Sequence, residues 1–192
     1  HYMEVMSMRA GFIGAGKVGF SLGRYLAEGG VTVTGYYSRN SRSAREAAEF
    51  TGTDHYEDLD AITADSDTLF ITVPDGAISG VWDRLRDMPI KDKNICHCSG
   101  SISSTVFFDA EDKGACAYSV HPLYAVSDRY HSYKKLGNAV FSVEGSEKNL
   151  DVVRKVFEGM GMQGWTTTAS KDDGVDAVVV NPIPLMGGLT II

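Results

Sequence analysis

Short apolar stretches rich in β-branched and aromatic residues alternate along this chain with longer stretches that are compatible with helices. The first kind predicts strands near residues 9–14, 31–37, 68–73, 94–98, 115–120, 139–143 and 163–168, with a weaker one near 53–56. The second kind predicts helices near residues 17–28, 42–50, 76–87, 103–110 and 146–160. Such alternation is typical of parallel sheets. We therefore expect an α/β fold with a doubly wound, mostly parallel sheet.

Local signals bound several of these elements. Asn40-Ser41 can cap the helix expected over 42–50, and Gly52 follows its end. Residues 67–73 are apolar almost throughout, which indicates a strand buried on both faces, and Pro74 ends it.

The most informative motif lies at the first predicted strand–helix junction. Phe12-Ile13 is followed by Gly14-x-Gly16-x-x-Gly19 and then by a helix-compatible run. In a dinucleotide-binding turn, the first glycine permits the tight turn, the second lets backbone approach a pyrophosphate, and the third lets the helix pack closely on the strand. The helix start and its dipole then face the phosphates. A purely structural glycine turn is the alternative. The residues predicted to bind the nucleotide here are Gly14, Ala15, Gly16, Lys17, Val18 and Gly19.

The end of the second predicted strand indicates which dinucleotide binds. NAD sites usually place an Asp or Glu about 20 residues beyond the glycine turn, bonded to the ribose 2′-hydroxyl. That window has no carboxylate here and ends in Ser38-Arg39, with Arg42 a turn further on. Arg can bind two phosphate oxygens, whereas a carboxylate would repel them, so we predict NADP(H) with Ser38 and Arg39 on its 2′-phosphate. The absence of this Asp or Glu also argues against FAD and S-adenosylmethionine, which are generally held through the same ribose carboxylate. The alternative is that both arginines are solvated loop residues.

Further chemistry is expected where later strands end, because ligands of an open parallel sheet bind beyond the carboxyl ends of its strands. Val73, Pro74 and Asp75 follow one such strand and are predicted to bind the coenzyme on its ribose side. Ser99 and Ser101 follow the next strand, where their hydroxyls would lie near the nicotinamide.

His121 follows the strand after that and is the best titratable candidate, since an imidazole works near neutral pH as acid, base or donor. We predict His121, Ser99 and Ser101 as the catalytic or substrate-contacting residues. Two structural roles are the alternatives: the serines could cap a helix beginning near Ser103, and His121 could fix the turn into Pro122.

Composition narrows the choice of partners. The chain has 192 residues, 43% of them hydrophobic, which suffices for one packed domain and part of another. Its 18 Lys and Arg against 25 Asp and Glu give a net charge of −7, which argues against a nucleic-acid partner. No apolar run reaches the ~20 residues that span a bilayer, and residues 1–8 lack signal-peptide features. We expect a cytoplasmic protein with a small-molecule substrate and no membrane or nucleic-acid partner.

Three cysteines, Cys96, Cys98 and Cys116, are odd in number and do not suit a disulfide framework. Cys96-His97-Cys98 has metal-binding residue types, but on a strand the two cysteines point to one face and His97 to the other. We therefore expect no metal here and small buried side chains instead.

The last residues fit a single domain poorly. Pro182 and Pro184 would break any long helix within residues 171–192. We expect a nucleotide-binding domain over residues 9–170, and over residues 171–192 the incomplete start of a C-terminal helical domain. Residues 1–8 are expected to be an expression remnant ahead of a natural start near Met8.

Five segments together resemble a known family of oxidoreductases. They are Gly-Phe-Ile-Gly-Ala-Gly-Lys-Val-Gly at 11–19, Tyr-Ser-Arg at 37–39, Thr-Val-Pro-Asp at 72–75, Cys-Ser-Gly-Ser at 98–101 and Ser-Val-His-Pro-Leu at 119–123. The chain resembles the Rossmann-like oxidoreductases whose C-terminal half is the domain of unknown function 2520. More distantly it is similar to pyrroline-5-carboxylate reductases, deazaflavin-dependent NADP reductases and the 6-phosphogluconate dehydrogenase-like superfamily.

The resemblance implies an NADP-binding domain followed by a helical domain that pairs two subunits, so a homodimer is expected if that domain is complete. The chain departs from the superfamily's β-hydroxyacid dehydrogenases after Ser170, because Lys171 is followed three residues later by Gly174 and Asn181 has no lysine at the spacing of their Lys-x-x-Asn arrangement. Two hypotheses follow. The first is an NADP(H)-dependent oxidoreductase that acts on a small carbonyl, imine or alcohol, and the second is a non-enzymatic NADP(H)-binding sensory or regulatory module.

Overall fold

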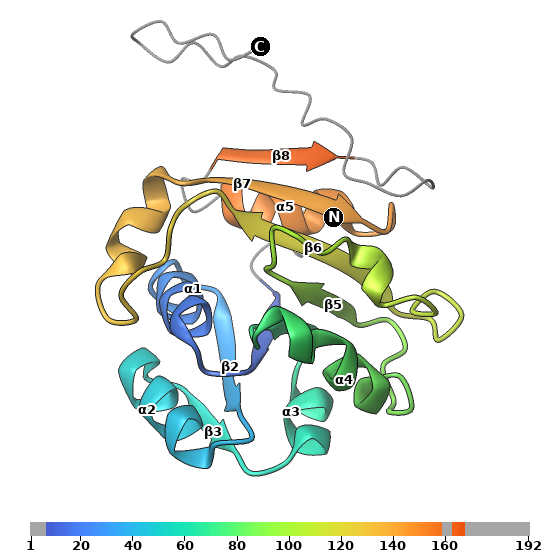
Figure 1. The fold of residues 1–192 in the computed structure, drawn as a ribbon, viewed down its shortest axis with the longest axis horizontal. Helices are drawn as coiled ribbons and strands as arrows, with labels where there is room; N and C mark the ends of the chain where they lie inside the picture. Colours follow the sequence, from blue (N-terminus) through green and yellow to red (C-terminus); the bar gives the residue numbers. More distant parts are fainter. Residues whose placement is uncertain (1–6, 159–162, 168–192) are drawn as a thin grey trace, which may run out of the picture.

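An eight-stranded sheet forms the centre of the molecule. In a computed structural model, which describes residues 7–158 and 163–167, its strand order is β3-β2-β1-β4-β5-β6-β7-β8 (Figure 1). The first six strands, in the order 3-2-1-4-5-6, reproduce the doubly wound dinucleotide-binding arrangement. The predicted α/β class and doubly wound sheet are confirmed.

The strands lie within a few residues of their predicted positions. Five pairs, from β3 to β6 across the sheet, are parallel, β7 is antiparallel to β6, and β8 is parallel to β7. The carboxyl ends of β1, β2, β4, β5 and β6 therefore share one edge of the sheet. The bounds are β1 (Arg9–Ile13), β2 (Thr32–Tyr37), β3 (Asp54–Tyr56), β4 (Thr68–Ile71), β5 (Asn94–His97), β6 (Cys116–Pro122), β7 (Val140–Gly145) and β8 (Gln163–Thr167).

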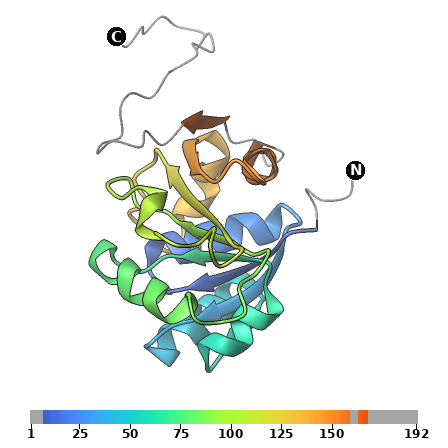
Figure 2. The ribbon, with the colours of Figure 1, turned by 90° about the vertical axis from the view of Figure 1, so that its right-hand side faces the viewer.

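Helices cover both faces of the sheet (Figures 1 and 2). Buried side chains of α1, α2 and α5 form one core with one face, and those of α3 and α4 form a second core on the other. The bounds are α1 (Lys17–Glu28), α2 (Ser41–Thr51), α3 (Leu59–Asp65), α4 (Asp75–Leu85) and α5 (Leu150–Glu158), with two 3-10 helices, η1 (Ser104–Val106) and η2 (Ser132–Asn138).

Alternating residues of β1 supply both cores, as strand geometry requires. Phe12 stacks between Tyr36 and Phe70 at centroid distances of 5.1 and 5.2 Å, and Ile13 belongs to the opposite core. The buried Tyr36 hydroxyl donates to the Gly19 carbonyl of α1 at 2.6 Å. The second strand and the first helix are thereby fixed relative to each other.

Three parts of the helix prediction were wrong. The chain forms α3, which is too short to show helical periodicity and begins at an Asp58 cap that accepts from the Ala61 N–H at 2.7 Å. It forms η2, which was not predicted. The expected helix over 103–110 is reduced to η1, in which the Val106 and Phe107 N–H groups donate to carbonyls three residues back. Glu144 of β7 accepts from the Ser104 N–H at 3.0 Å and links the start of η1 to the sheet.

Some expectations concern residues outside the described ranges. These are the C-terminal domain over 171–192, most of the remnant over 1–8, and residues 159 and 160 of the last predicted helix. Met8 is described and is buried in the first core. No helix in the described part of the chain is both long and apolar enough to cross a membrane.

Candidate functional site

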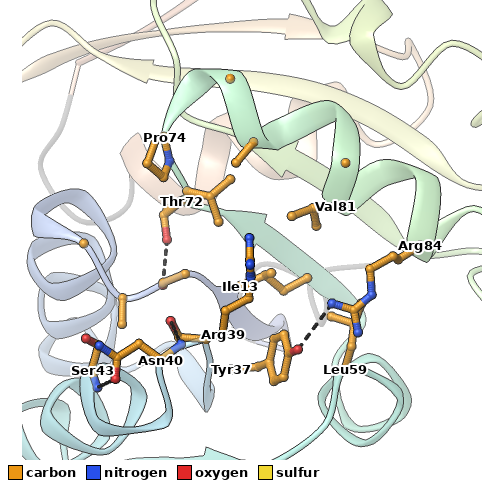
Figure 3. A pocket seen from close by; sticks show the side chains of 18 of the residues that line it. Ile13, Tyr37, Arg39, Asn40, Ser43, Leu59, Thr72, Pro74, Val81 and Arg84 are labelled. Atoms are coloured by element: carbon orange, nitrogen blue, oxygen red, sulfur yellow. Dashed lines mark hydrogen bonds between the residues drawn. The ribbon is translucent and has the colours of Figure 1, made fainter.

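A cavity of about 880 Å³ lies at the carboxyl edge of the sheet, around the ends of β1, β2 and β4 (Figure 3). The loops that follow these strands form its walls, together with the first turns of α2 and α4. The lining residues are Ile13, Gly14, Ala15, Gly16, Tyr37, Ser38, Arg39, Asn40, Ser43, Leu59, Thr72, Val73, Pro74, Gly76, Ala77, Gly80, Val81, Arg84 and Arg129.

The glycine turn after β1 has the geometry that its sequence predicts. Gly14 has a φ of +103°, a conformation that favours glycine, and its N–H donates to the Tyr37 carbonyl at 2.8 Å. Thr72 Oγ1 donates to the Gly14 carbonyl at 3.0 Å. A Cβ at Gly19 would lie 2.6 Å from the same Thr72 Oγ1. Turn formation and close helix packing therefore require glycine at positions 14 and 19.

The start of α1 is open toward this turn. Gly16 is the N-cap residue and has no side chain to accept a hydrogen bond from the first turn. The first backbone bond of the helix runs from the Phe20 N–H to the Gly16 carbonyl, so the N–H groups of residues 17–19 precede the hydrogen-bonded ladder. A helix start of this kind stabilises an anion.

Arginine dominates the charge of the cavity. Among the described residues that line it, Arg39, Arg84 and Arg129 are cationic and none is Asp or Glu. Figure 3 shows Arg39 reaching from the end of β2 toward the middle of the cavity. Arg39 has no ion pair or hydrogen bond to any residue of the described ranges. The Arg84 guanidinium lies over the Tyr37 ring and donates to its hydroxyl at 3.3 Å.

The two arginines predicted beside the second strand differ in their surroundings. Arg42 does not line the cavity; its side chain is 87% exposed and its Nε donates to Glu46 at 3.0 Å. Asn40 caps α2 by accepting from the Arg42 and Ser43 N–H groups, which confirms the predicted cap. The solvated-residue alternative thus describes Arg42, whereas Arg39 lies in the cavity wall.

The predicted catalytic residues form a second cluster further along the same edge. Ser101 Oγ donates to Asp75 Oδ2 at 2.9 Å, and the Ser101 N–H donates to Ser99 Oγ at 3.2 Å. The His121 ring lies against Gly100, which is the residue between the two serines in the sequence. Neither serine caps a helix at Ser103, because Ser103 itself caps η1.

The His121 ring is oriented by the neighbouring strand. Its Nδ1 lies 3.2 Å from the Cys98 carbonyl, which can only accept, so Nδ1 donates. Its Nε2 has no hydrogen-bond partner within residues 7–158 and 163–167, and it is therefore available to a ligand. The ring is held by the end of β5 and not by the turn into Pro122.

The cavity and this cluster are adjacent but distinct. Asp75 begins α4, whose Gly76 and Ala77 line the cavity, and the same carboxylate binds Ser101. Of the residues predicted from sequence, these do not line the cavity: Lys17, Val18, Gly19, Asp75, Ser99, Ser101 and His121.

His97 positions the serine loop. Ser99 N–H donates to His97 Nδ1 at 3.1 Å, so the proton resides on Nε2, which donates to the Ser103 carbonyl at 3.1 Å. Burial lowers the pKa of the His97 imidazole below its ordinary value of 6.5. A buried neutral ring therefore fixes both ends of the loop.

The cysteines lie in the sheet with free thiols. Cys96 and Cys116 are buried and Cys98 is half-buried. Burial raises the pKa of the Cys98 thiol to about 12 and also raises that of Cys96, so the thiolate form is disfavoured. In the described ranges, no group of three or more His, Cys, Asp and Glu residues is arranged to hold a metal ion.

Sequence reasoning missed five polar lining residues. Thr72 follows β4 directly, so its hydroxyl at a strand end was the available signal. Arg84 lies three turns into α4, and Arg129 lies in the β6–β7 connection, where no local pattern marks a nucleotide contact. The five are Asn40, Ser43, Thr72, Arg84 and Arg129.

The fold and the glycine turn agree with a family assignment. The profile of the Rossmann-like domain family matches residues 3–122, and the chain belongs to this family. No curated protein matches the chain.

Three solved structures illustrate the fold that this chain shares. A Bacteroides fragilis protein named as a candidate NADP oxidoreductase is 18% identical, with a TM-score of 0.75 over 85% of this chain and 62% of its own. A Mycobacterium tuberculosis 3-hydroxyisobutyrate dehydrogenase is 21% identical, with a TM-score of 0.69 over 86% of this chain and 56% of its own. An Aspergillus terreus reductive aminase, solved with NADPH and ethyl-5-oxohexanoate, is 18% identical, with a TM-score of 0.67 over 84% and 55%.

This chain therefore spans only 55% to 62% of the length of those three proteins. At such identities the likeness shows the shared fold.

Proposed function

We propose that this chain binds NADP(H) and is the coenzyme domain of an oxidoreductase that acts on a small carbonyl, imine or alcohol. The observation that carries the proposal is the charge of the cavity. Three arginines line it together with Gly16, the N-cap residue of α1, and no carboxylate is among its described lining residues, although the chain has a net charge of −7. A local positive potential in an acidic protein favours an anionic ligand at this place.

The dimensions and donors of the cavity suit a dinucleotide. A volume of about 880 Å³ lies at the upper end of the range for small-molecule sites. The backbone of residues 14–19 would hold the diphosphate, and Ser38 and Arg39 the 2′-phosphate. Val73 to Asp75 would flank a ribose. When bound, the coenzyme supplies or accepts a hydride.

The cluster beyond α4 would face the reacting end. His121 presents an unpaired Nε2, and Ser99 and Ser101 present hydroxyls that Asp75 orients through Ser101. These groups can position a carbonyl or imine and move a proton at Nε2. The names of two structural neighbours support this substrate class, because one is a reductive aminase solved with ethyl-5-oxohexanoate and the other is a 3-hydroxyisobutyrate dehydrogenase. The resemblance to oxidoreductases that carry the domain of unknown function 2520 supports it as well. A homodimer formed through a C-terminal helical domain belongs to the same proposal.

Calorimetric titration with NADPH, NADH and FAD tests the coenzyme. We expect NADPH to bind most tightly, because only NADPH presents a third phosphate to Arg39. Binding of none of the three, or tighter binding of FAD or NADH, would contradict the proposal.

Turnover tests the reaction. NADPH oxidation is followed by its absorbance across a panel of ketones, imines and semialdehydes, with a matched alcohol panel for NADP⁺ reduction. Oxidation of NADPH with at least one compound is the expected result. Tight NADPH binding without oxidation across the panels would instead favour the sensory or regulatory module.

A further inference from the structure

The connection between β6 and β7 contributes Arg129 to the lining of the proposed nucleotide cavity. It includes η2, which packs against α1, and Figure 1 shows this yellow-to-orange segment beside α1. The Tyr130 ring meets Phe20 of α1 edge-on at 5.6 Å and Phe50 of α2 at 5.3 Å. The connection is therefore anchored on α1, whose N-cap residue Gly16 lines the cavity, and on α2, whose first turn contributes Ser43 to the lining.

Arg129 precedes this anchor and extends into the cavity wall. Its guanidinium carbon lies 4.9 Å above the centre of the Phe20 ring. The Asp128 carboxylate accepts from the Tyr130 N–H at 2.7 Å and from the His131 N–H at 3.1 Å, which fixes the backbone on either side of Arg129. The arginine is held at the cavity by its neighbours, whereas its own charged group is only loosely engaged.

That loose engagement involves Glu46. Arg129 Nη1 lies 3.8 Å from Glu46 Oε2, which is an ion-pair contact but too long for a hydrogen bond. Arg129 makes no hydrogen bond to the part of the chain that the structure describes. The same Glu46 already accepts from Arg42 at 3.0 Å. One carboxylate is thus shared by two arginines, and the donors of Arg129 remain available.

We infer that Arg129 is a second ligand of the NADP(H) 2′-phosphate and a determinant of coenzyme specificity, supplied by the β6–β7 connection. The inference rests on the proposed function. Contact with Glu46 places the guanidinium beside α2, the helix that follows Arg39 and carries the lining residue Ser43. A phosphate monoester carries nearly two charges, so two arginines match it better than one. Arg129 exchanges its loose contact with Glu46 for the phosphate.

The test compares dissociation constants for NADPH and NADH by calorimetry. Arg129→Met removes the charge and retains an unbranched chain over Phe20. We expect NADPH binding to weaken roughly tenfold and NADH binding to change by less than about twofold. Lys134→Met is the matched control, because Lys134 is an exposed cation of η2 that does not line the cavity. It should leave both constants unchanged.

Two fragments separate the possible phosphate contacts. Adenosine 2′,5′-bisphosphate should lose affinity for Arg129→Met, whereas adenosine 5′-diphosphate should not. An equal loss of affinity for NADPH and NADH would indicate that Arg129 contacts the diphosphate, and it would overturn the inference. Unchanged NADPH binding would overturn it as well. Thermal unfolding of each variant verifies that the fold is retained.

The Glu46→Gln variant provides an independent second test of the inference. Removing the carboxylate that competes for Arg129 should tighten NADPH binding severalfold without affecting NADH. Weaker NADPH binding in this variant would contradict the exchange. A wild-type chain that binds neither coenzyme would overturn the proposed function itself, whereas normal wild-type binding with insensitive Arg129 variants would overturn only the present inference.

Discussion

Replacing Arg39 by Met should reduce the preference of the cavity for NADPH over NADH. Arg39 is exposed and has no partner in the described ranges, so binding a phosphate does not require it to give up an existing ion pair. Two unit charges 4 Å apart interact by about 1 kcal/mol in water and about 4 kcal/mol near a protein surface. After desolvation we expect a loss of about 1–2 kcal/mol, which is about 5- to 30-fold in the dissociation constant.

Calorimetric titration measures this loss directly for both coenzymes. NADH binding should change by less than about twofold, since NADH lacks the 2′-phosphate. Arg45→Met is the matched control, because Arg45 belongs to the adjoining helix, pairs with Glu57 at 3.1 Å and does not line the cavity. An equal loss for NADPH and NADH, or no loss at all, would refute the assignment of Arg39 to the 2′-phosphate.

Three further predictions concern stability and turnover. Gly19→Ala places a methyl group 2.6 Å from Thr72 Oγ1 and should lower the free energy of unfolding by about 1–3 kcal/mol in urea titrations. Gly80→Ala, whose methyl group meets nothing within 4 Å, should raise it by about 0.5–1 kcal/mol; equal stabilities would contradict the close packing at Gly19. Because the pKa of His97 is lower in the folded chain than in the unfolded chain, the unfolded chain takes up a proton at a higher pH. The free energy of unfolding should therefore fall as the pH falls below about 6.5. Urea midpoints of His97→Gln should show a smaller pH slope, and an unchanged slope would refute this origin. His121→Gln should lower kcat by about 10²-fold or more at unchanged NADPH affinity, and unaffected turnover would remove His121 from the proton step.

The fold was largely predictable because it follows from local patterns. Most predicted strands contain apolar runs bounded by turn residues, and the glycine turn fixes the first strand–helix junction. The failures have physical causes. The α3 helix spans seven residues and depends on a single aspartate cap. The segment after Ser103 has helix-compatible residues but forms only η1, and its start is tied to Glu144, a residue distant in sequence that no local pattern indicates.

The residues of the cavity were predictable only where a single segment of the sequence indicates what binds there. Gly14, Gly16 and Arg39 were predicted because the glycine turn, and the position where an NAD site would have an acidic residue, lie at fixed spacings in the sequence. Arg84 and Arg129 were missed because they reach the cavity through tertiary packing, Arg84 against Tyr37 and Arg129 over Phe20.

The second cluster was predictable only through the rule for strand ends. That rule brought Ser99, Ser101 and His121 to one edge of the sheet, and the structure places them close together. It could not specify that they lie beside the cavity and outside its lining. Their catalytic role stays a prediction.

A crystal structure of this chain with NADP⁺ at saturating concentration tests the central claim most directly. The account predicts the diphosphate at the N–H groups that begin α1 and the 2′-phosphate in contact with Arg39. Coenzyme bound elsewhere, or a cavity without coenzyme in crystals soaked at saturation, would contradict it.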